Sequence, residues 1–206
     1  MSMNNPYRAI TDLPEAIPLF PLEGALLLPR GQLPLNIFEP RYLAMIDAAL
    51  SGSRLIGMIQ PAGSDDLVLR KVGCSGRITQ FAETGDGRYL ITLTGVCRFR
   101  LKEELTSRGL FRQARVDYTE FADDLVPRHG EDSVDRAAVI SALHKFADVS
   151  RIKVDWKAID EAPNEALVNA LAISSRGPPS FSTNSNAAST RTSETSRCST
   201  RHRPGH

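Results

Sequence analysis

The sequence predicts an α+β fold in which a run of β-strands is followed by a run of helices. Short apolar stretches broken by glycine or proline extend from residue 17 to residue 121, and apolar residues recur at helical spacing from about residue 132. No Leu, Ile, Val or Met follows Ile173. We therefore expect a β-rich unit over residues 16–121, a helical unit over 131–173 and a disordered tail over 174–206.

The first strands are expected in three short apolar runs, Ile17–Pro21, Ala25–Leu28 and Leu33–Phe38. Proline carries no backbone N–H, so it is confined to strand starts, edges and bulges. The first run, which contains two prolines, should therefore be an edge-like strand. Turns around Gly24 and Gly31 separate the three runs.

A helix is expected directly after the third strand. Pro40 suits the first turn of a helix, where its missing N–H leaves no hydrogen bond unmade. Over the next ten residues, one face collects the apolar side chains Tyr42, Leu43, Ile46, Ala49 and Leu50. Gly52 should end this helix.

The remaining strands are expected to be short and separated by glycines. Gly73 and Gly76 divide two of them, and Gly85-Asp86-Gly87 has the chemistry of a hairpin turn. The expected ranges are 55–60, 66–72, 77–81, 88–94, 96–102 and 111–121. Helices should follow, the first capped by Asp132 or Ser133, the second capped by Asp155 and the third started by Pro163.

Charge is distributed unevenly along the chain. The tail from residue 174 has five Arg, one acidic residue and 14 Ser or Thr, which makes it about +4. The whole chain carries +1, so the body is about −3. A mildly acidic body argues weakly against nucleic acid as the partner, because neutralisation of phosphates dominates such binding.

The absence of a recognisable targeting signal and the pattern of cysteines favour the cytoplasm. The first eleven residues contain no long apolar run, and no stretch approaches the roughly 18 to 20 apolar residues that cross a bilayer. The three cysteines, Cys74, Cys97 and Cys198, are widely spaced and odd in number, which favours a reduced, cytoplasmic protein. We expect no contact with a membrane.

Motifs for catalysis are missing from the sequence. There is no phosphate-binding loop, and the body has no G-x-S-x-G elbow. None of the four histidines stands at metal-ligand spacing with a cysteine. We therefore expect no catalytic residues, no metal and no cofactor.

Four separated motifs give the chain a family resemblance. They are Pro18-Leu19-Phe20-Pro21-Leu22, the stretch Pro34-Leu35-Asn36-Ile37-Phe38-Glu39-Pro40-Arg41-Tyr42, the glycines Gly73 and Gly76, and Gly95-Val96-Cys97-Arg98-Phe99-Arg100. In this order they resemble the stand-alone form of the LON substrate-binding domain, the N-terminal domain of Lon protease, over about residues 16–173. The resemblance implies a PUA-like β-barrel followed by a helical unit, in a bacterial protein. It also implies substrate recognition without the ATPase and Ser–Lys protease domains.

Candidate binding residues cluster first at the strand-to-helix junction, at Phe38, Glu39, Arg41 and Tyr42. Glu39 and Arg41 flank Pro40, where a carboxylate meets the positive end of a helix. The pair either fixes this corner of the fold, which we favour, or contacts a ligand directly.

A second candidate is the basic stripe, by which we mean Arg98, Arg100 and Lys102 on one face of a strand. It is either a solvated outer face, which we favour, or a dock for an acidic peptide or RNA. The apolar stretch from Phe20 to Leu28 belongs either to the core or to an exposed barrel mouth.

The leading hypothesis is a non-catalytic module that binds exposed segments of other proteins or peptides. RNA binding, by analogy with PUA folds, is the alternative, although the basic stripe lacks interleaved aromatic residues for base stacking. A continuous positive groove would favour RNA, whereas an apolar cleft would favour a peptide. The sequence leaves the oligomeric state open.

Two origins of the tail remain open. It is either a natural disordered tail or an out-of-frame reading of a GC-rich gene, since the apolar face of the last helix stops abruptly at Ile173. Translation of the same DNA in another frame would decide between them.

Overall fold

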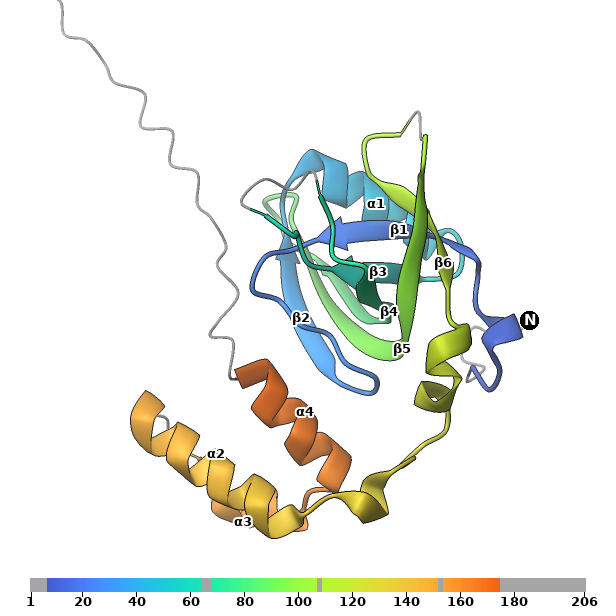
Figure 1. Ribbon diagram of the computed structural model, residues 1–206. Helices are drawn as coiled ribbons and strands as arrows, with labels where there is room; N and C mark the ends of the chain where they lie inside the picture. The colour runs from blue at the N-terminus through green and yellow to red at the C-terminus, as the bar shows by residue number, and fades with distance from the viewer. Residues whose placement is uncertain (1–6, 64–67, 107–108, 152–153, 175–206) are drawn as a thin grey trace, which may run out of the picture.

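A computed structural model describes residues 7–63, 68–106, 109–151 and 154–174 (Figure 1). The elements are η1 (Ile10–Asp12), β1 (Ala16–Pro21), β2 (Gln32–Ile37), α1 (Pro40–Leu50), β3 (Leu55–Ile59), β4 (Val72–Glu83), β5 (Tyr89–Leu105), β6 (Gln113–Asp117), η2 (Thr119–Leu125), η3 (Glu131–Ser133), α2 (Arg136–Ser150), α3 (Trp156–Glu161) and α4 (Asn164–Ser174). This order confirms the α+β class. The expected disorder of the tail concerns residues outside the described ranges, apart from Ser174.

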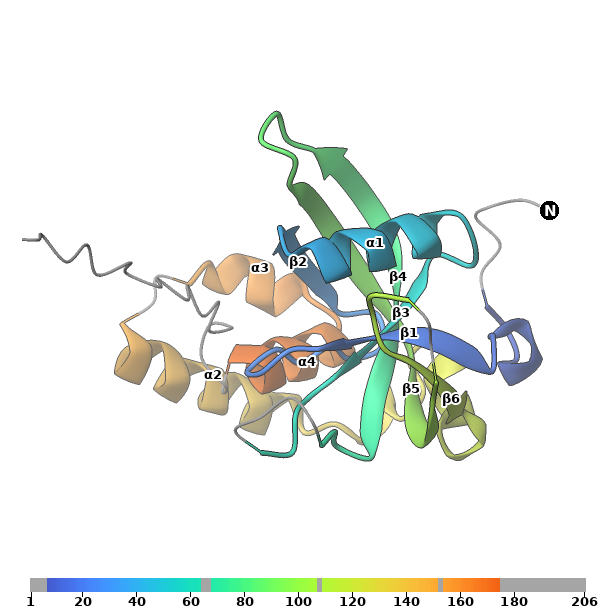
Figure 2. The same cartoon turned by 90° about the horizontal axis from the view of Figure 1, so that it is seen from above.

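Six strands form one sheet in the order β2-β5-β4-β3-β1-β6. β5 also pairs with β6, so that the pairing β5-β4-β3-β1-β6 returns to β5. The 17-residue β5 makes this possible because its first half pairs with β2 and its second half pairs with β6. The hairpin that joins β4 to β5 projects beyond the rest of the sheet (Figure 2).

Three glycines lie inside long strands, although the sequence predicted that they separate short ones. Gly73 and Gly76 belong to β4, and Gly95 lies within β5. A Cβ atom at Gly73 would overlap the Phe99 ring, and one at Gly95 would overlap the carbonyl group of Leu28. These glycines therefore permit close packing against the strand, which is the usual meaning of glycine in a strand interior.

The expectation that the first strand is an edge was wrong, because β1 lies between β3 and β6. Its first half, Ala16 to Pro18, pairs with β6 alone, and its second half, Leu19 to Pro21, pairs with β3 alone. Pro18 thus has no partner in β3, and Pro21 has none in β6. Such half-pairing leaves room for the prolines Pro18 and Pro21, which lack a donor.

Two expected strands are not formed. Ala25–Leu28 is irregular, and of the expected strand 66–72 the described residues before Val72 contribute only an isolated bridge between Leu69 and Pro61. Both segments are apolar because they contribute core side chains from irregular backbone. Ala25 and Leu27 enter one core cluster and Leu69 enters the other.

The core consists of two apolar clusters that share β5. One contains Ile91 and Leu93 of β5 and the buried face of α1, whose members are Tyr42, Met45, Ile46 and Ala49. The other contains Cys97 and Phe99 of β5, together with buried residues of β1 and β6. The helical spacing of residues 40–50 was therefore predicted correctly.

The helices after the sheet begin close to the predicted places. Asp155 caps α3 by accepting hydrogen bonds from the N–H groups of Lys157 and Ala158, as predicted. Asp135 caps α2 through the N–H of Ala138, whereas Asp132 and Ser133 were expected there. Asp132 and Ser133 instead form η3 together with Glu131.

The helices α2, α3 and α4 lie together on one side of the sheet in both views (Figures 1 and 2). Their buried residues Leu143, Ala147 and Leu167 belong to neither of the two sheet clusters. The helical unit therefore has a small apolar core of its own. No helix within the described ranges has the length and apolar character needed to cross a membrane.

The packing at Gly95 leads to a test. We expect Gly95→Ala to lower the free energy of unfolding by about 3 kcal/mol, because the new methyl group meets the Leu28 backbone and cannot be accommodated by a side-chain movement. Urea denaturation of the purified protein measures the change. Gly85→Ala is the matched control, since nothing lies near a Cβ there, and equal losses in the two variants would contradict the packing argument.

Candidate functional site

The candidate site is an apolar cleft of about 770 Å³ between the segment Ala25–Leu28 and residues 60–62 and 68–73. Gln60 joins its two walls by donating from Nε2 to the carbonyl oxygen of Ala25 at 2.9 Å. The apolar residues that line it are Ala25, Leu26, Leu27, Leu28, Met58, Ile59, Ala62, Val68, Leu69, Val72 and Cys74. We call this hollow the apolar cleft.

Alternation along residues 25–28 creates one wall of the apolar cleft. Ala25 and Leu27 are buried in the core, whereas Leu26 and Leu28 are only half-buried and remain available to the cleft. The sequence left open whether the stretch from Phe20 to Leu28 is core or the exposed mouth of a barrel. Within it, Ala25 and Leu27 belong to the core, whereas Leu26 and Leu28 contribute half-buried side chains to the cleft. On the other wall, Val68 and Val72 are exposed.

Every member of the basic stripe has an acidic partner. Arg98 pairs with Asp124 at 2.7 Å, Arg100 pairs with Glu120 at 2.5 Å and Lys102 pairs with Asp117 at 2.8 Å. Asp117 is the last residue of β6, and Glu120 and Asp124 lie in η2. The sequence predicted the stripe but missed these partners, whose only signal is an acidic run after the last strand.

Arg98 is held more tightly than the other two basic residues. Asp124 accepts hydrogen bonds from the backbone N–H of Arg98 and from its Nε and Nη2 atoms, at 2.9, 2.8 and 2.7 Å. The Asp124 side chain is only 8% exposed, and the guanidinium group of Arg98 lies 4.8 Å from the centre of the Phe121 ring. This pair fixes η2 against β5 and leaves Arg98 little freedom to contact a ligand.

At the strand-to-helix junction, Glu39 and Arg41 pair with each other at 2.9 Å. Their side chains are 43% and 47% exposed, and Glu39 caps α1 with its backbone position but without a side-chain hydrogen bond. A pair this exposed contributes little stability. The geometry does not test the direct ligand contact that the sequence left open, so that contact stays a prediction.

The neighbours of this pair differ in their burial. Tyr42 is buried, its ring lies 4.2 Å from that of Phe20, and its hydroxyl donates to the carbonyl oxygen of Pro21. Phe38 is exposed, with the guanidinium group of Arg88 5.8 Å from its ring centre. Tyr42 is therefore part of the core, whereas Phe38 is available at the surface.

The predicted site residues do not form one cluster. Ile37, next to the junction, pairs with Tyr89 at the start of β5, while Arg98 lies nine residues further along the same strand. At about 3.3 Å per residue, this separation is on the order of 30 Å of strand. The junction residues and the basic stripe thus belong to different parts of the surface.

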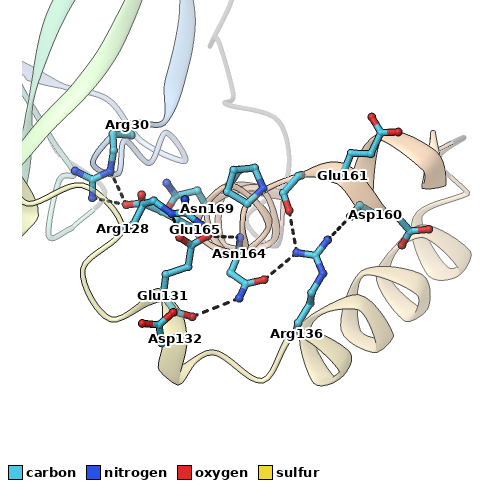
Figure 3. A pocket seen from close by; sticks show the side chains of 13 residues that line it. Arg30, Arg128, Glu131, Asp132, Arg136, Asp160, Glu161, Asn164, Glu165 and Asn169 are labelled. Atoms are coloured by element: carbon cyan, nitrogen blue, oxygen red, sulfur yellow. Dashed lines mark hydrogen bonds and ion pairs between the residues drawn. The ribbon is translucent and has the colours of Figure 1, made fainter.

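A polar junction between the sheet and the helices, to which Arg30 contributes, was not indicated by any sequence pattern (Figure 3). Its Nε donates to Glu165 of α4 at 2.6 Å, and its Nη1 donates to the carbonyl oxygen of Asp124 at 2.5 Å. Asn169 of α4 donates to the carbonyl oxygen of Pro29 at 2.9 Å. Partners that lie 94 to 140 residues apart leave no local pattern in a sequence.

A second hollow, of about 610 Å³, lies among these helices and is lined mainly by polar groups (Figure 3). Arg136 donates to the carbonyl oxygens of Ile159, Asp160 and Ala162. Glu131 accepts the N–H of Asn164 at 2.8 Å and pairs with Arg128, which holds the pKa of the Glu131 carboxyl below its usual range. These polar groups already serve the packing of the helices, so we favour the apolar cleft as the site.

The two buried cysteines, Cys74 in the cleft lining and Cys97 in the core, are not activated as nucleophiles. Burial raises the pKa of the Cys97 thiol to about 12 and also raises that of Cys74, so both thiols remain protonated and behave as small apolar side chains. Within the described residues, no group of three or more His, Cys, Asp or Glu side chains is placed to hold a metal ion.

An apolar cleft on a sheet-centred α+β domain is the surface expected of a binding domain. A family model described as the ATP-dependent protease La (LON) substrate-binding domain matches residues 16–192. This chain therefore belongs to the LON substrate-binding domain family, as its motifs indicated.

Similar proteins are Lon proteases and their N-terminal domains. Lon protease 2 of Myxococcus xanthus is 29% identical over 116 residues, which cover 53% of this chain and 14% of that protein. Lon protease of Dictyoglomus thermophilum is 26% identical over 172 residues, covering 81% of this chain and 20% of that protein. The matched part is thus a fifth or less of either relative.

Among solved structures, the N-terminal domain of the Mycobacterium avium complex Lon protease has the same fold. It matches with a TM-score of 0.55 at 18% identity, and the match covers 79% of this chain and 82% of that one.

The contrast between the ion pairs can be measured. We expect Asp124→Ala to lower the free energy of unfolding by about 2–3 kcal/mol, because three hydrogen bonds to a buried carboxylate are lost. Glu120→Ala, which removes an exposed pair, should cost less than about 1 kcal/mol. Urea denaturation of both variants gives the values, and similar losses would show that Asp124 has no special role in holding η2.

Proposed function

We propose that this domain recognises exposed apolar segments of other proteins and binds them in the apolar cleft. The observation that carries the proposal is the cleft itself, whose walls present half-buried or exposed Leu26, Leu28, Val68 and Val72 to solvent. Apolar side chains of a bound segment would be removed from water there, which is the main driving force for such association. Membership of a family of substrate-binding domains supports the same function.

The RNA alternative has less support from the geometry. The basic stripe, which the sequence analysis weighed as a dock for an acidic peptide or RNA, is paired with Asp117, Glu120 and Asp124. Paired cations release fewer counterions on binding a phosphate backbone, and counterion release supplies much of the affinity for nucleic acids. RNA therefore enters the test below as a competitor.

We also propose that the pairing circuit β5-β4-β3-β1-β6 is the PUA-like barrel implied by the family resemblance. On this proposal the barrel unit occupies residues 16–121 and the helical unit occupies residues 131–173. The cytoplasm is the proposed location, on the evidence of the sparse cysteines. We further propose that the domain binds without catalysis, so that purified protein should hydrolyse ATP no faster than a heat-inactivated control.

Peptide binding tests the proposed function. We expect a short labelled peptide rich in Leu and Phe to bind the wild-type protein, and Val68→Asp and Val72→Asp to weaken binding by about tenfold or more, because each places a charge in an apolar wall. Fluorescence anisotropy gives the dissociation constants, with unlabelled single-stranded RNA as a competitor.

Val149→Asp is the matched control for this experiment. Val149 lies in α2 and is 84% exposed, so the same substitution there should leave peptide affinity unchanged. Circular dichroism confirms that the variants are folded. If the wild-type protein bound no apolar peptide, or if all three variants bound equally well, the cleft would not be the site. Displacement of the peptide by RNA at equal concentration would favour the alternative.

A further inference from the structure

The mouth of the apolar cleft carries two cations on fixed backbone. Arg70 and Lys71 both line the cleft and both have exposed side chains. The N–H of Arg70 donates to the carbonyl oxygen of Gln60 at 2.8 Å, and the carbonyl oxygen of Lys71 accepts the N–H of Leu101 at 2.8 Å. The backbone of both residues is therefore tied down, so their charges stay close to the apolar walls.

These two cations differ from the neighbouring basic stripe in how they are paired. Val72, the next residue, pairs with Arg100 of β5, so the stripe begins beside them. All three stripe residues are in ion pairs, but within the described ranges neither Arg70 nor Lys71 pairs with an acidic group. The nearby carboxylates of Asp117, Glu120 and Asp124 are already engaged.

From this arrangement we propose that the cleft selects apolar segments flanked by acidic residues, and that Arg70 and Lys71 determine this preference. The inference rests on the proposed function and adds the charge of the substrate. An extended segment advances about 3.3 Å per residue, so an Asp or Glu one to three residues from its apolar core can reach a cation at the rim. The cleft supplies affinity, and the rim discriminates between flanking charges.

The net charge of the body makes these two cations distinctive. Since the body outside the basic tail is about −3, its net charge repels a ligand with acidic flanks, whereas Arg70 and Lys71 attract such flanks locally at the cleft mouth. A ligand with basic flanks meets the opposite pattern. Charge complementarity would thus direct an acidic-flanked segment to the place where its apolar core can be buried.

Three labelled peptides test the preference. They share one apolar core and carry Asp, Ser or Lys on both flanks. For the wild-type protein we expect the Asp peptide to bind about three- to tenfold more tightly than the Ser peptide at low salt, as two surface ion pairs allow. The Lys peptide should bind most weakly, and the differences should shrink near 0.5 M salt, where the screening length is only about 4 Å.

Variants of the rim assign the effect to these residues. The double variant Arg70→Gln/Lys71→Gln should bind the Asp and Ser peptides equally. Arg70→Glu/Lys71→Glu should reverse the order and favour the Lys peptide. Lys145→Gln/Lys157→Gln is the matched control, since it removes the same charge from exposed positions on α2 and α3 and should retain the preference.

The outcomes separate this inference from the proposed function. If no peptide binds, the proposed function fails. If all three peptides bind the wild-type protein equally, or if the control variant loses the preference as well, the rim cations do not select the substrate and the inference fails alone. Tighter binding of single-stranded RNA than of the Asp peptide, abolished in Arg70→Gln/Lys71→Gln, would assign the cations to phosphate and overturn the peptide preference.

Discussion

The close contact between Gly95 and the turn Leu28–Gly31 is the constraint on which the rest of the structure depends. The carbonyl oxygen of Gly95 accepts the N–H of Arg30 at 2.8 Å, and its N–H donates to the carbonyl oxygen of Gly31 at 2.9 Å. Gly95 also marks the place where β5 stops pairing with β2 and approaches its pairing with β6. A side chain at this position would push the turn away from the strand.

Three other features follow from this contact. It places Leu28 at the wall of the apolar cleft. It directs Arg30, whose backbone adopts a left-handed conformation with φ of 61°, toward Glu165 and Asp124. It also leaves the second half of β5 free to meet β6, so that both core clusters can form around one strand.

The sequence predicted the elements whose cause is local. The spacing of apolar residues located α1, and Asp155 identified the start of α3, because periodicity and capping depend on residues a few positions apart. The glycines were misinterpreted as breaks since a local pattern does not reveal what packs against them. Only the ring of Phe99 and the carbonyl group of Leu28 explain why Gly73 and Gly95 occur inside strands.

In the candidate site, too, the sequence predicted local features but not those that depend on distant residues. The sequence indicated the basic stripe, but the partners that neutralise it come from a segment about 20 residues later. The apolar cleft was foreseen only as an open alternative for residues 20–28. Its second wall comes from the connection before β4, which the sequence predicted to be a regular strand.

The turn Leu28–Gly31 has a mechanical consequence, because the cleft and the helical unit share it. Leu28 and Arg98 line the apolar cleft, and both also line a smaller hollow under α4 with Val168 and Asn169. The turn is short, because the N–H of Gly31 donates to the carbonyl oxygen of Leu28, and Arg30 and Gly31 are both hydrogen-bonded to Gly95, so we expect it to move as a unit. A bound segment that displaces Leu28 outward would therefore push against α4, and a force applied to α4 would change the shape of the cleft through the same turn.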